Sequence, residues 1–397
     1  MRMCVGVFRF FHHAVGGPTV EHCIFVGCDL HVKTMLMRVA TDAGEPETWR
    51  YANRHADRLA LLKALGARAR ALGGARVLLA YETSSLGYVL YDEVVEAGFE
   101  CSVIATTKMP RTWKHVLEKT DERDAQLLLD LLRSHVLAGT ALASVWVPTH
   151  QERDDREMIR ARLDLVDKLT RVKTQVRSLL CRYDLKCPPD VGKGWTQKFV
   201  AWLHSLVGSA LRYGASVRLG VLLAEFEALG AELAYVDNQM KALASSERYA
   251  PLVSALCEVK GVGLVTALTF LVEMGDLCRF SNRRQVGSYL GLVPRCHESG
   301  ESSDRKGHIT RHGPPRVRRV LGQAVGHWVR WSPGAKARYE HMVGKRPKDK
   351  KRLKKIAKVA MMRRLGILLW RRGLEVMVQG APQPPQDVVT RFCTPAE

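Results

Sequence analysis

The sequence has no long apolar segment, no metal-binding cysteine pairs and few acidic residues. None of its apolar runs approaches the roughly 18 residues that a transmembrane helix needs, so the sequence predicts no membrane span. Its ten cysteines include no Cys-x-x-Cys pair and no cysteine–histidine array with zinc-ligand spacing. Residues 1–22 lack the apolar core and cleavage site of a secretory signal, and we expect them to form a disordered extension. These absences together predict a reduced, cytoplasmic protein.

The shortage of acidic residues is concentrated at the back of the chain. In total, 40 Asp and Glu residues face 61 Lys and Arg residues, which gives a net charge of +21. Residues 23–135 hold 15 of each sign, residues 136–249 carry a net +3, and residues 250–397 hold 28 basic against 11 acidic residues. This excess predicts a polyanionic partner, either nucleic acid or an anionic membrane surface.

The first 150 residues have the pattern of an α/β domain. Three short apolar runs come first, and helical patterns then alternate with two further apolar runs. We expect strands at residues 24–28, 35–40, 48–51, 76–81 and 101–105, and helices at 54–72, 87–97 and 121–135. We therefore assign residues 23–150 to one domain.

Four carboxylates lie at the ends of these predicted elements. Asp29 ends the first strand, and Glu82 ends the fourth. Asp121 and Asp124 open the last helix, three positions apart and therefore on one face. Strand ends and helix starts meet at one edge of an α/β sheet, where clustered carboxylates repel one another unless cations are bound. Mg²⁺ prefers oxygen ligands, and two such ions could activate a phosphodiester for cleavage.

The order of these acids, on the first strand, the fourth strand and the closing helix, is a ribonuclease-H-like pattern. A simpler interpretation is that Asp121 only caps the helix and that Asp124 is solvated.

Residues 151–249 are predicted to be mainly helical. Charged and apolar residues alternate with helical spacing over 151–182 and 216–246, and a stretch containing Pro, Gly and Trp joins the two segments. Two long helices with few aromatic residues suggest a coiled coil, either antiparallel or between subunits. An ordinary helical bundle explains the same pattern equally well.

Two glycines precede an apolar helix in the segment Lys260-Gly261-Val262-Gly263. Free backbone N–H groups at such a helix start could hold a phosphate, as in a helix–hairpin–helix grip on DNA. The segment lacks the Gly-Lys-Ser/Thr of a P-loop and the third glycine of a Rossmann fingerprint. A tight turn between two helices is an equally good interpretation.

The polar, glycine-containing composition of residues 297–304 predicts a loop, and a run of basic residues follows it. A serine hydroxyl among guanidinium groups could attack a phosphodiester, although a surface loop whose serines bond only locally has the same composition. We therefore predict a mainly α domain over residues 250–335 that carries this loop. Residues 336–397 are predicted to form a basic helical tail, which either contacts nucleic-acid phosphates or is a solvated helix face.

These motifs together resemble those of the insertion-sequence-110 family of transposases. The blocks similar to its front, DEDD domain are Gly27-Cys28-Asp29 with Lys33, Tyr81-Glu82-Thr83 and Lys119–Ala125. The blocks similar to its C-terminal transposase domain are Val259–Gly263, Ser288–Arg295, Glu298-Ser299-Gly300 and Lys306–Thr310. They follow in the family's order over residues 23–372, and residues 183–215 look like an insertion.

The resemblance implies a RuvC-like DEDD catalytic domain over residues 23–150. It also implies how this domain and a serine together cleave DNA. In this family the four acids bind Mg²⁺, two ions per site, with Mn²⁺ able to replace it; here the acids are Asp29, Glu82, Asp121 and Asp124. A serine attacks DNA to form a phosphoserine link, and Ser299 stands at its position. Ser302 and Ser303 are the next candidates.

The resemblance also implies partners: donor and target DNA, a guide RNA encoded by the element, and a homodimer or homotetramer paired across the coiled coil. The expected location is the cytoplasm of a bacterium, at the nucleoid. The residues expected to contact nucleic acid are Lys33, Gly261, Gly263, Arg295, Arg305, Lys306, Arg311, Arg316, Arg318, Arg319, Lys351, Lys354 and Lys355.

Two other functions fit the same residues. One is a metal-dependent junction endonuclease in which water is the nucleophile and Ser299 is incidental. The other is a nucleic-acid-binding protein whose catalytic domain is inactive.

Overall fold

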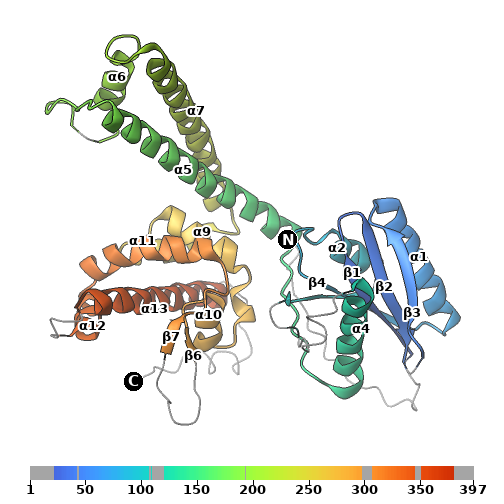
Figure 1. Cartoon of the computed structure of the whole chain (residues 1–397). Helices are drawn as coiled ribbons and strands as arrows, with labels where there is room; N and C mark the ends of the chain where they lie inside the picture. Colours follow the sequence, from blue (N-terminus) through green and yellow to red (C-terminus); the bar gives the residue numbers. More distant parts are fainter. Residues whose placement is uncertain are drawn as a thin grey trace. The chain divides into compact units, whose positions relative to one another are not determined.

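The computed structural model describes residues 22–42, 44–106, 109, 120–192, 194–296, 306–344 and 350–379. The chain divides into two compact units, residues 1–147 and 148–397 (Figure 1). The predicted extension at residues 1–22 lies, except for its last residue, outside the described residues.

A five-stranded sheet forms the centre of the first unit, in the order β3-β2-β1-β4-β5. Its strands are β1 (Cys23–Leu30), β2 (Thr34–Thr41), β3 (Glu47–Ala52), β4 (Arg76–Glu82) and β5 (Glu100–Ile104). The strands β1, β2 and β3 pair antiparallel, whereas β4 and β5 join β1 in parallel. All five predicted strands are confirmed, and the arrangement is consistent with the predicted ribonuclease-H-like domain.

Among the residues that the structure describes in this unit, helices cover both faces of the sheet (Figure 1). They are α1 (His55–Ala71), α2 (Val89–Glu96) and α4 (Asp121–Ala138). Alternate residues of β1, such as Val26 and Cys28, pack with the buried leucines of α1 and α2 on one face. Phe25 of β1 packs instead with Leu128 and Leu129 of α4 on the other face. The period of two along β1 therefore assigns each residue to one of two cores.

Gly27 allows α4 to lie directly against the sheet. A Cβ at this position would overlap the carbonyl oxygen of Ala125 and the amide nitrogen of Leu129, both backbone atoms of α4. Because Gly27 is two residues before Asp29 on the same face of β1, this close approach also sets how near the start of α4 comes to Asp29.

Replacing Gly27 with Ala should therefore destabilise the first unit. Backbone atoms cannot move aside as a side chain can, so we expect overpacking to cost about 1–3 kcal/mol, seen as a lower Tm of the full chain. Gly66→Ala in α1 is the matched control, because its Cβ would meet only Arg70 and Phe99 side-chain atoms at 3.5 and 3.6 Å. The control should be neutral or slightly stabilising, since Ala favours helix over Gly. Equal melting of the Gly27→Ala variant and the unmodified protein would contradict this interpretation.

A long helical hairpin opens the second unit. It consists of α5 (His150–Arg182) and α7 (Tyr213–Ala244), with the short α6 (Gln197–Ser205) between them (Figure 1). Thr149 and Glu152 form a reciprocal capping box at the start of α5. The two long helices run antiparallel within one chain and share a core that includes Val176, Leu179 and Leu219. The helix α6 was not predicted, because its nine residues lie between Pro- and Gly-containing segments.

The remaining helices form one layered bundle. They are α8 (Ala250–Cys257), α9 (Leu264–Met274), α10 (Arg283–Tyr289), α11 (Pro315–Trp331), α12 (Pro333–Val343) and α13 (Lys350–Gln379), with a short 3₁₀ turn at Leu277–Arg279. A single core joins Ile159 of α5, Phe270 of α9, Leu321 of α11 and Leu365 of α13. This core crosses both predicted boundaries, at residues 249/250 and 335/336, so α13 is packed into the bundle along its inner face.

A two-stranded antiparallel hairpin, β6 (Pro294–Cys296) and β7 (Lys306–Ile309), stands beside this bundle and was not predicted. The second unit is otherwise helical in its described residues, as predicted. Within those parts of both units that the structure describes, no helix combines the length and apolarity that crossing a membrane requires.

Candidate active site

Asp29 and Glu82 occupy neighbouring positions on two parallel strands. Cys28 of β1 pairs with Tyr81 of β4, so the next residues along the two strands are Asp29 and Glu82. Cys28 and Tyr81 are buried in the core beneath α1 and α2. Because side chains alternate along a strand, Asp29 and Glu82 belong to the opposite face, which α4 covers.

The other two acids lie on the first turn of α4. Thr120 is the N-cap, with its hydroxyl oxygen accepting from the Arg123 amide at 3.3 Å. Asp121 is thus the first helical residue and not the cap. Asp124 is only 8% exposed. The simpler interpretation is therefore wrong in both parts. Asp121 does not cap the helix, because Thr120 already accepts the hydrogen bond at its start. Asp124 is not solvated, because it lies on the buried face of α4 with Ala125 and Leu128.

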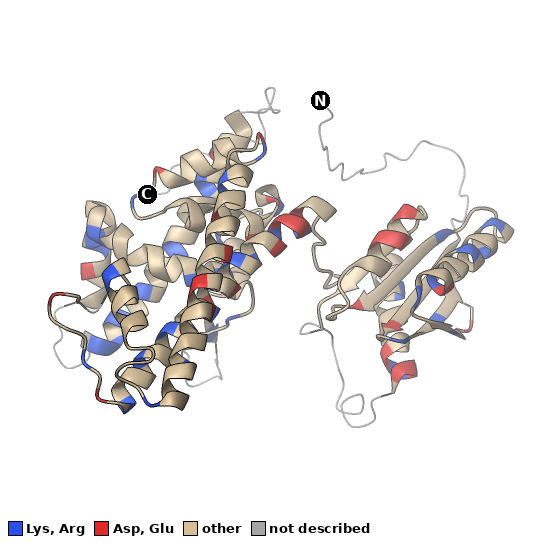
Figure 2. Ribbon diagram, turned by 90° about the horizontal axis from the view of Figure 1, so that it is seen from above, with Lys and Arg blue, Asp and Glu red and all other residues tan. Residues whose placement is uncertain are grey.

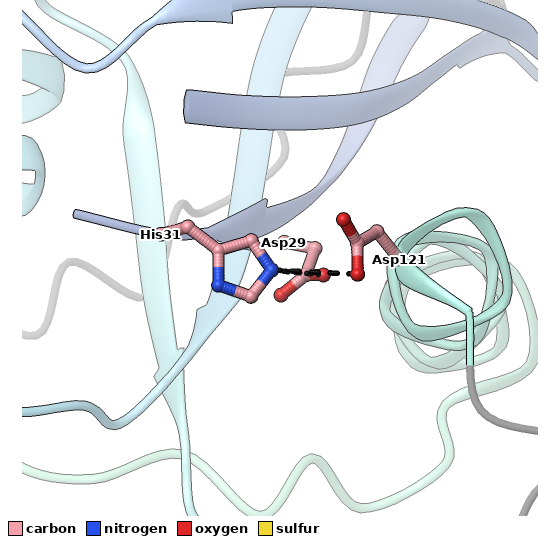
Figure 3. Close-up of side chains that lie close together, drawn as sticks. All are labelled: Asp29, His31 and Asp121. Atoms are coloured by element: carbon pink, nitrogen blue, oxygen red, sulfur yellow. Dashed lines mark hydrogen bonds and ion pairs between the residues drawn. The ribbon is translucent and has the colours of Figure 1, made fainter. Parts of the chain in front are cut away.

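The imidazole of His31 lies within reach of two of these carboxylates, those of Asp29 and Asp121 (Figure 3). Its Nε2 is 3.1 Å from Oδ2 of Asp29 and 3.5 Å from Oδ1 of Asp121. The three ligand atoms all lie within 4.8 Å of one another. Sequence reasoning missed this histidine, although its spacing of two from Asp29 places both residues on the same side of an extended segment.

The electrostatics of Asp29 fit a cation at this position. Burial raises the pKa of its carboxyl, His31 opposes that shift, and the charges of Asp121 and Asp124 raise the pKa further. Two carboxylates and an imidazole within reach of one another, with a third carboxylate close by, are a donor set suited to a divalent metal ion. Without a bound cation, the negative charges of these carboxylates repel one another and destabilise the folded unit.

This charge predicts a gain in stability when Asp29 is made neutral. A raised pKa means that folded, metal-free protein holds the Asp29 proton more tightly than the unfolded chain does. Stability is therefore lost as pH rises through the interval between the unfolded and folded pKa values. In EDTA at pH 7, we expect Asp29→Asn to raise Tm by about 2–4 °C, and the gain to shrink as pH falls toward about 4. Thermal melts at several pH values test this, and a variant that is no more stable at pH 7 would contradict it.

In the second unit, the predicted glycine segment is a packed turn between α8 and α9. Gly261 has φ +87°, and a Cβ there would lie 2.7 Å from the backbone nitrogen of Trp328 and 2.8 Å from Cβ of His327, both on α11. Packing alone thus requires glycine at this position, in agreement with the tight-turn interpretation. Gly263 is the N-cap of α9 and has open space around it.

Three predicted nucleic-acid ligands at the start of α11 have partners inside the second unit. Arg319 pairs with Asp167 of α5 at 2.6 Å, and Arg316 approaches Asp164 at 3.8 Å. Arg318 donates to the carbonyl oxygens of Leu290 and Gly313 at 3.2 and 2.8 Å. Arg318 therefore helps to hold the turn before α11, whereas the two exposed ion pairs can open.

Other predicted ligands are exposed and spread over both units. Figure 2 shows Lys and Arg distributed over many helices of the second unit. The exposed members of the predicted set are Lys33, Arg295, Arg311, Lys351, Lys354 and Lys355. Ser299, together with Ser302, Ser303 and Arg305, lies outside the described residues, and Lys306 opens β7.

Comparison with protein families identifies two domains on this chain. A family model described as a transposase, for the DEDD domain of IS110-type proteins, matches residues 26–184. A second model, described as the transposase IS116/IS110/IS902 family, matches residues 253–340. The first match contains all four acids, and the second contains Ser299.

Curated relatives agree with these matches. A putative transposase of Sinorhizobium fredii is 32% identical over 272 residues, which cover 68% of this chain and 61% of the relative. The transposase for insertion sequence element IS1533 of Leptospira borgpetersenii is 28% identical, over 64% of this chain and 70% of its own length. A pilin gene-inverting protein of Moraxella bovis is 33% identical over 112 residues, or 28% of this chain and 34% of its own. The chain thus spans less than two thirds of the Sinorhizobium relative. Two models of one family, matched in order along the sequence, and these relatives show that the chain belongs to the IS110 family of transposases.

Proposed function

We propose that this protein is the transposase of an insertion sequence and that it cuts and rejoins DNA at a divalent-metal site formed by Asp29, Glu82, Asp121 and Asp124. The observation that carries the proposal is the close approach of Asp29 to the start of α4, inside a matched DEDD domain. The relatives are named as transposases and, in one case, as a gene-inverting protein, which are activities on DNA.

Three of the four acids differ in their exposure within this proposed site. Asp29 has a side chain that is 17% exposed and Asp124 is more deeply buried, so both can orient a bound ion without competition from much water. Asp121 is 59% exposed, so a phosphodiester could reach it from solvent. When bound, Mg²⁺ or a similar ion stabilises the attacking and leaving oxygens of the phosphodiester.

Ser299 is the proposed nucleophile, on the basis of the family resemblance and its place in the second matched domain. Its Oγ would form a bond to phosphorus as the bond from phosphorus to a DNA oxygen breaks. The hydroxyl proton passes to a base, and the released DNA hydroxyl takes up a proton. Attack by another DNA hydroxyl on the phosphoserine then rejoins the strands and frees Ser299.

An element-encoded guide RNA and assembly as a homodimer or homotetramer belong to the same proposal. The net charge of +17 over residues 250–397 supports binding of nucleic acid, since phosphates need compensating cations along their backbone. Exposed lysines along α13 supply part of that charge.

Strand cleavage by the full chain tests the proposed function. The substrate is DNA that flanks the gene on either side, together with RNA transcribed from it. We expect cleavage and strand exchange in Mg²⁺ or Mn²⁺ and none in EDTA. Binding without cleavage under all of these conditions would favour an inactive nucleic-acid-binding protein instead.

The ion pairs of Arg316 and Arg319 make a separate prediction about DNA affinity. Asp164 and Asp167 compete with phosphates for these two arginines, so the double change Asp164→Asn and Asp167→Asn should tighten DNA binding by about two- to fivefold at low salt. Fluorescence anisotropy with labelled duplex measures it. Asp154→Asn is the control for each single change, Asp164→Asn or Asp167→Asn, because it too removes one negative charge from α5, about 15 Å or more from both residues along the helix. An equal gain from the control would show a general charge effect and would contradict a specific competition.

A further inference from the structure

We propose that His31 is a nitrogen ligand of this metal site and that the site consequently prefers Mn²⁺ over Mg²⁺. The inference rests on the proposed metal site at Asp29 and Asp121, and it adds a fifth residue that the four-acid pattern does not include. It assigns the metal preference of the protein to one side chain.

The distances fit a shared ion. Ligand atoms at right angles around an octahedral metal, each about 2.1 Å from it, lie about 3 Å apart. Nε2 of His31 is 3.1 Å from Oδ2 of Asp29 and 3.5 Å from Oδ1 of Asp121. Within the residues that the structure describes, these three side chains are the group whose ligand atoms come together closely enough to hold a metal.

The backbone of His31 is held in place at both of its polar groups. Its N–H donates to the carbonyl oxygen of Thr34 at 2.9 Å, and its own carbonyl accepts from Nδ2 of Asn53 at 2.7 Å. The backbone N–H of Asn53 in turn donates to the backbone carbonyl oxygen of Lys33 at 2.9 Å. The turn between β1 and β2 is thus anchored to the end of β3, and the imidazole is presented to the acids from a fixed position.

The chemistry of the donor set leads from this geometry to a metal preference. Mg²⁺ is a hard ion that takes oxygen ligands and retains much of its water. Imidazole nitrogen binds more readily to transition metals, whose affinity for nitrogen exceeds that of Mg²⁺. A site of carboxylates plus one imidazole therefore favours Mn²⁺ over Mg²⁺ relative to a site of carboxylates alone.

Pulsed electron paramagnetic resonance of Mn²⁺ bound to the full chain tests the proposal directly, because coordinated imidazole produces a nitrogen hyperfine coupling. The chain has 14 histidines, so the signal must be assigned by substitution. We expect the coupling in the unmodified protein and its loss in His31→Gln. His55→Gln is the matched control, since His55 also pairs with a carboxylate, Glu93 at 2.9 Å, in the same unit. The coupling should persist in that variant.

Metal affinity provides a second readout. We expect His31→Gln to weaken Mn²⁺ binding at least about tenfold. His31→Asp supplies oxygen in place of nitrogen and should shift the ratio of affinities toward Mg²⁺. Mn²⁺ that binds through Asp29 without nitrogen coupling, or with a coupling that survives His31→Gln, would overturn the proposal and leave the acidic metal site standing. Absence of any Mn²⁺ binding that depends on Asp29 would overturn both.

Discussion

Replacing Asp29 with Asn lowers DNA strand cleavage at least about 1,000-fold, because loss of one carboxylate from a metal-assisted phosphoryl-transfer site removes several kcal/mol of transition-state stabilisation. Asp29 lies where the first strand, the fourth strand and the start of α4 meet, and its side chain contacts His31, which also reaches Asp121. An amide at this position keeps the size of the side chain but loses its charge. Initial rates of cleavage of end-labelled DNA measure the effect.

Two observations separate this loss from damage to the fold. The same variant is expected to melt at a higher temperature in EDTA at pH 7, so a loss of activity cannot come from unfolding. Asp130→Asn is the matched control on α4, because Asp130 is exposed and accepts a hydrogen bond from Gln126 at 2.9 Å within the helix. It should cleave at the unmodified rate. Equal cleavage rates of Asp29→Asn and Asp130→Asn would show that Asp29 has no role in the reaction.

Replacing Ser299 with Ala should abolish the covalent protein–DNA product completely, since no other atom of that side chain can form the phosphoester. DNA binding should be unchanged, because alanine removes a hydroxyl and no charge. Denaturing electrophoresis of labelled DNA, before and after proteinase treatment, detects the covalent product.

Ser302→Ala and Ser303→Ala are the controls, as neighbouring serines of the same segment. If the product persists in Ser299→Ala and disappears in one of the control variants, the serine replaced in that control variant is the nucleophile. If cleavage persists in Ser299→Ala without any covalent product in the unmodified protein, water is the nucleophile and the protein acts as a metal-dependent endonuclease.

The fold of the first unit follows from local sequence to a large degree. Continuous apolar runs such as Ile24–Cys28 and Val77–Tyr81 are typical of buried strands, and an acid at the end of such a run marks the sheet edge. The strand pairing then places Asp29 beside Glu82, as the order of elements implies. Helical spacing of leucines likewise predicted α4 and therefore the position of Asp121.

Features that depend on contacts distant in sequence could not be predicted in this way. The reach of His31 to Asp121 depends on how closely α4 approaches β1, which Gly27 permits. Gly261 is required by α11, more than 60 residues later, and the helix–hairpin–helix pattern contains no sign of that contact. The strands β6 and β7 have three and four residues, too few for a recognisable alternation.

The yield of covalent protein–DNA product, with a divalent metal ion and with EDTA, tests most directly whether the acids at this sheet edge form the metal site for DNA cleavage and joining. The unmodified full chain, Asp29→Asn and Ser299→Ala are compared on the same flanking DNA and RNA. We expect a product only in the unmodified protein and only with Mg²⁺ or Mn²⁺. An undiminished yield in Asp29→Asn, or in EDTA, would contradict it.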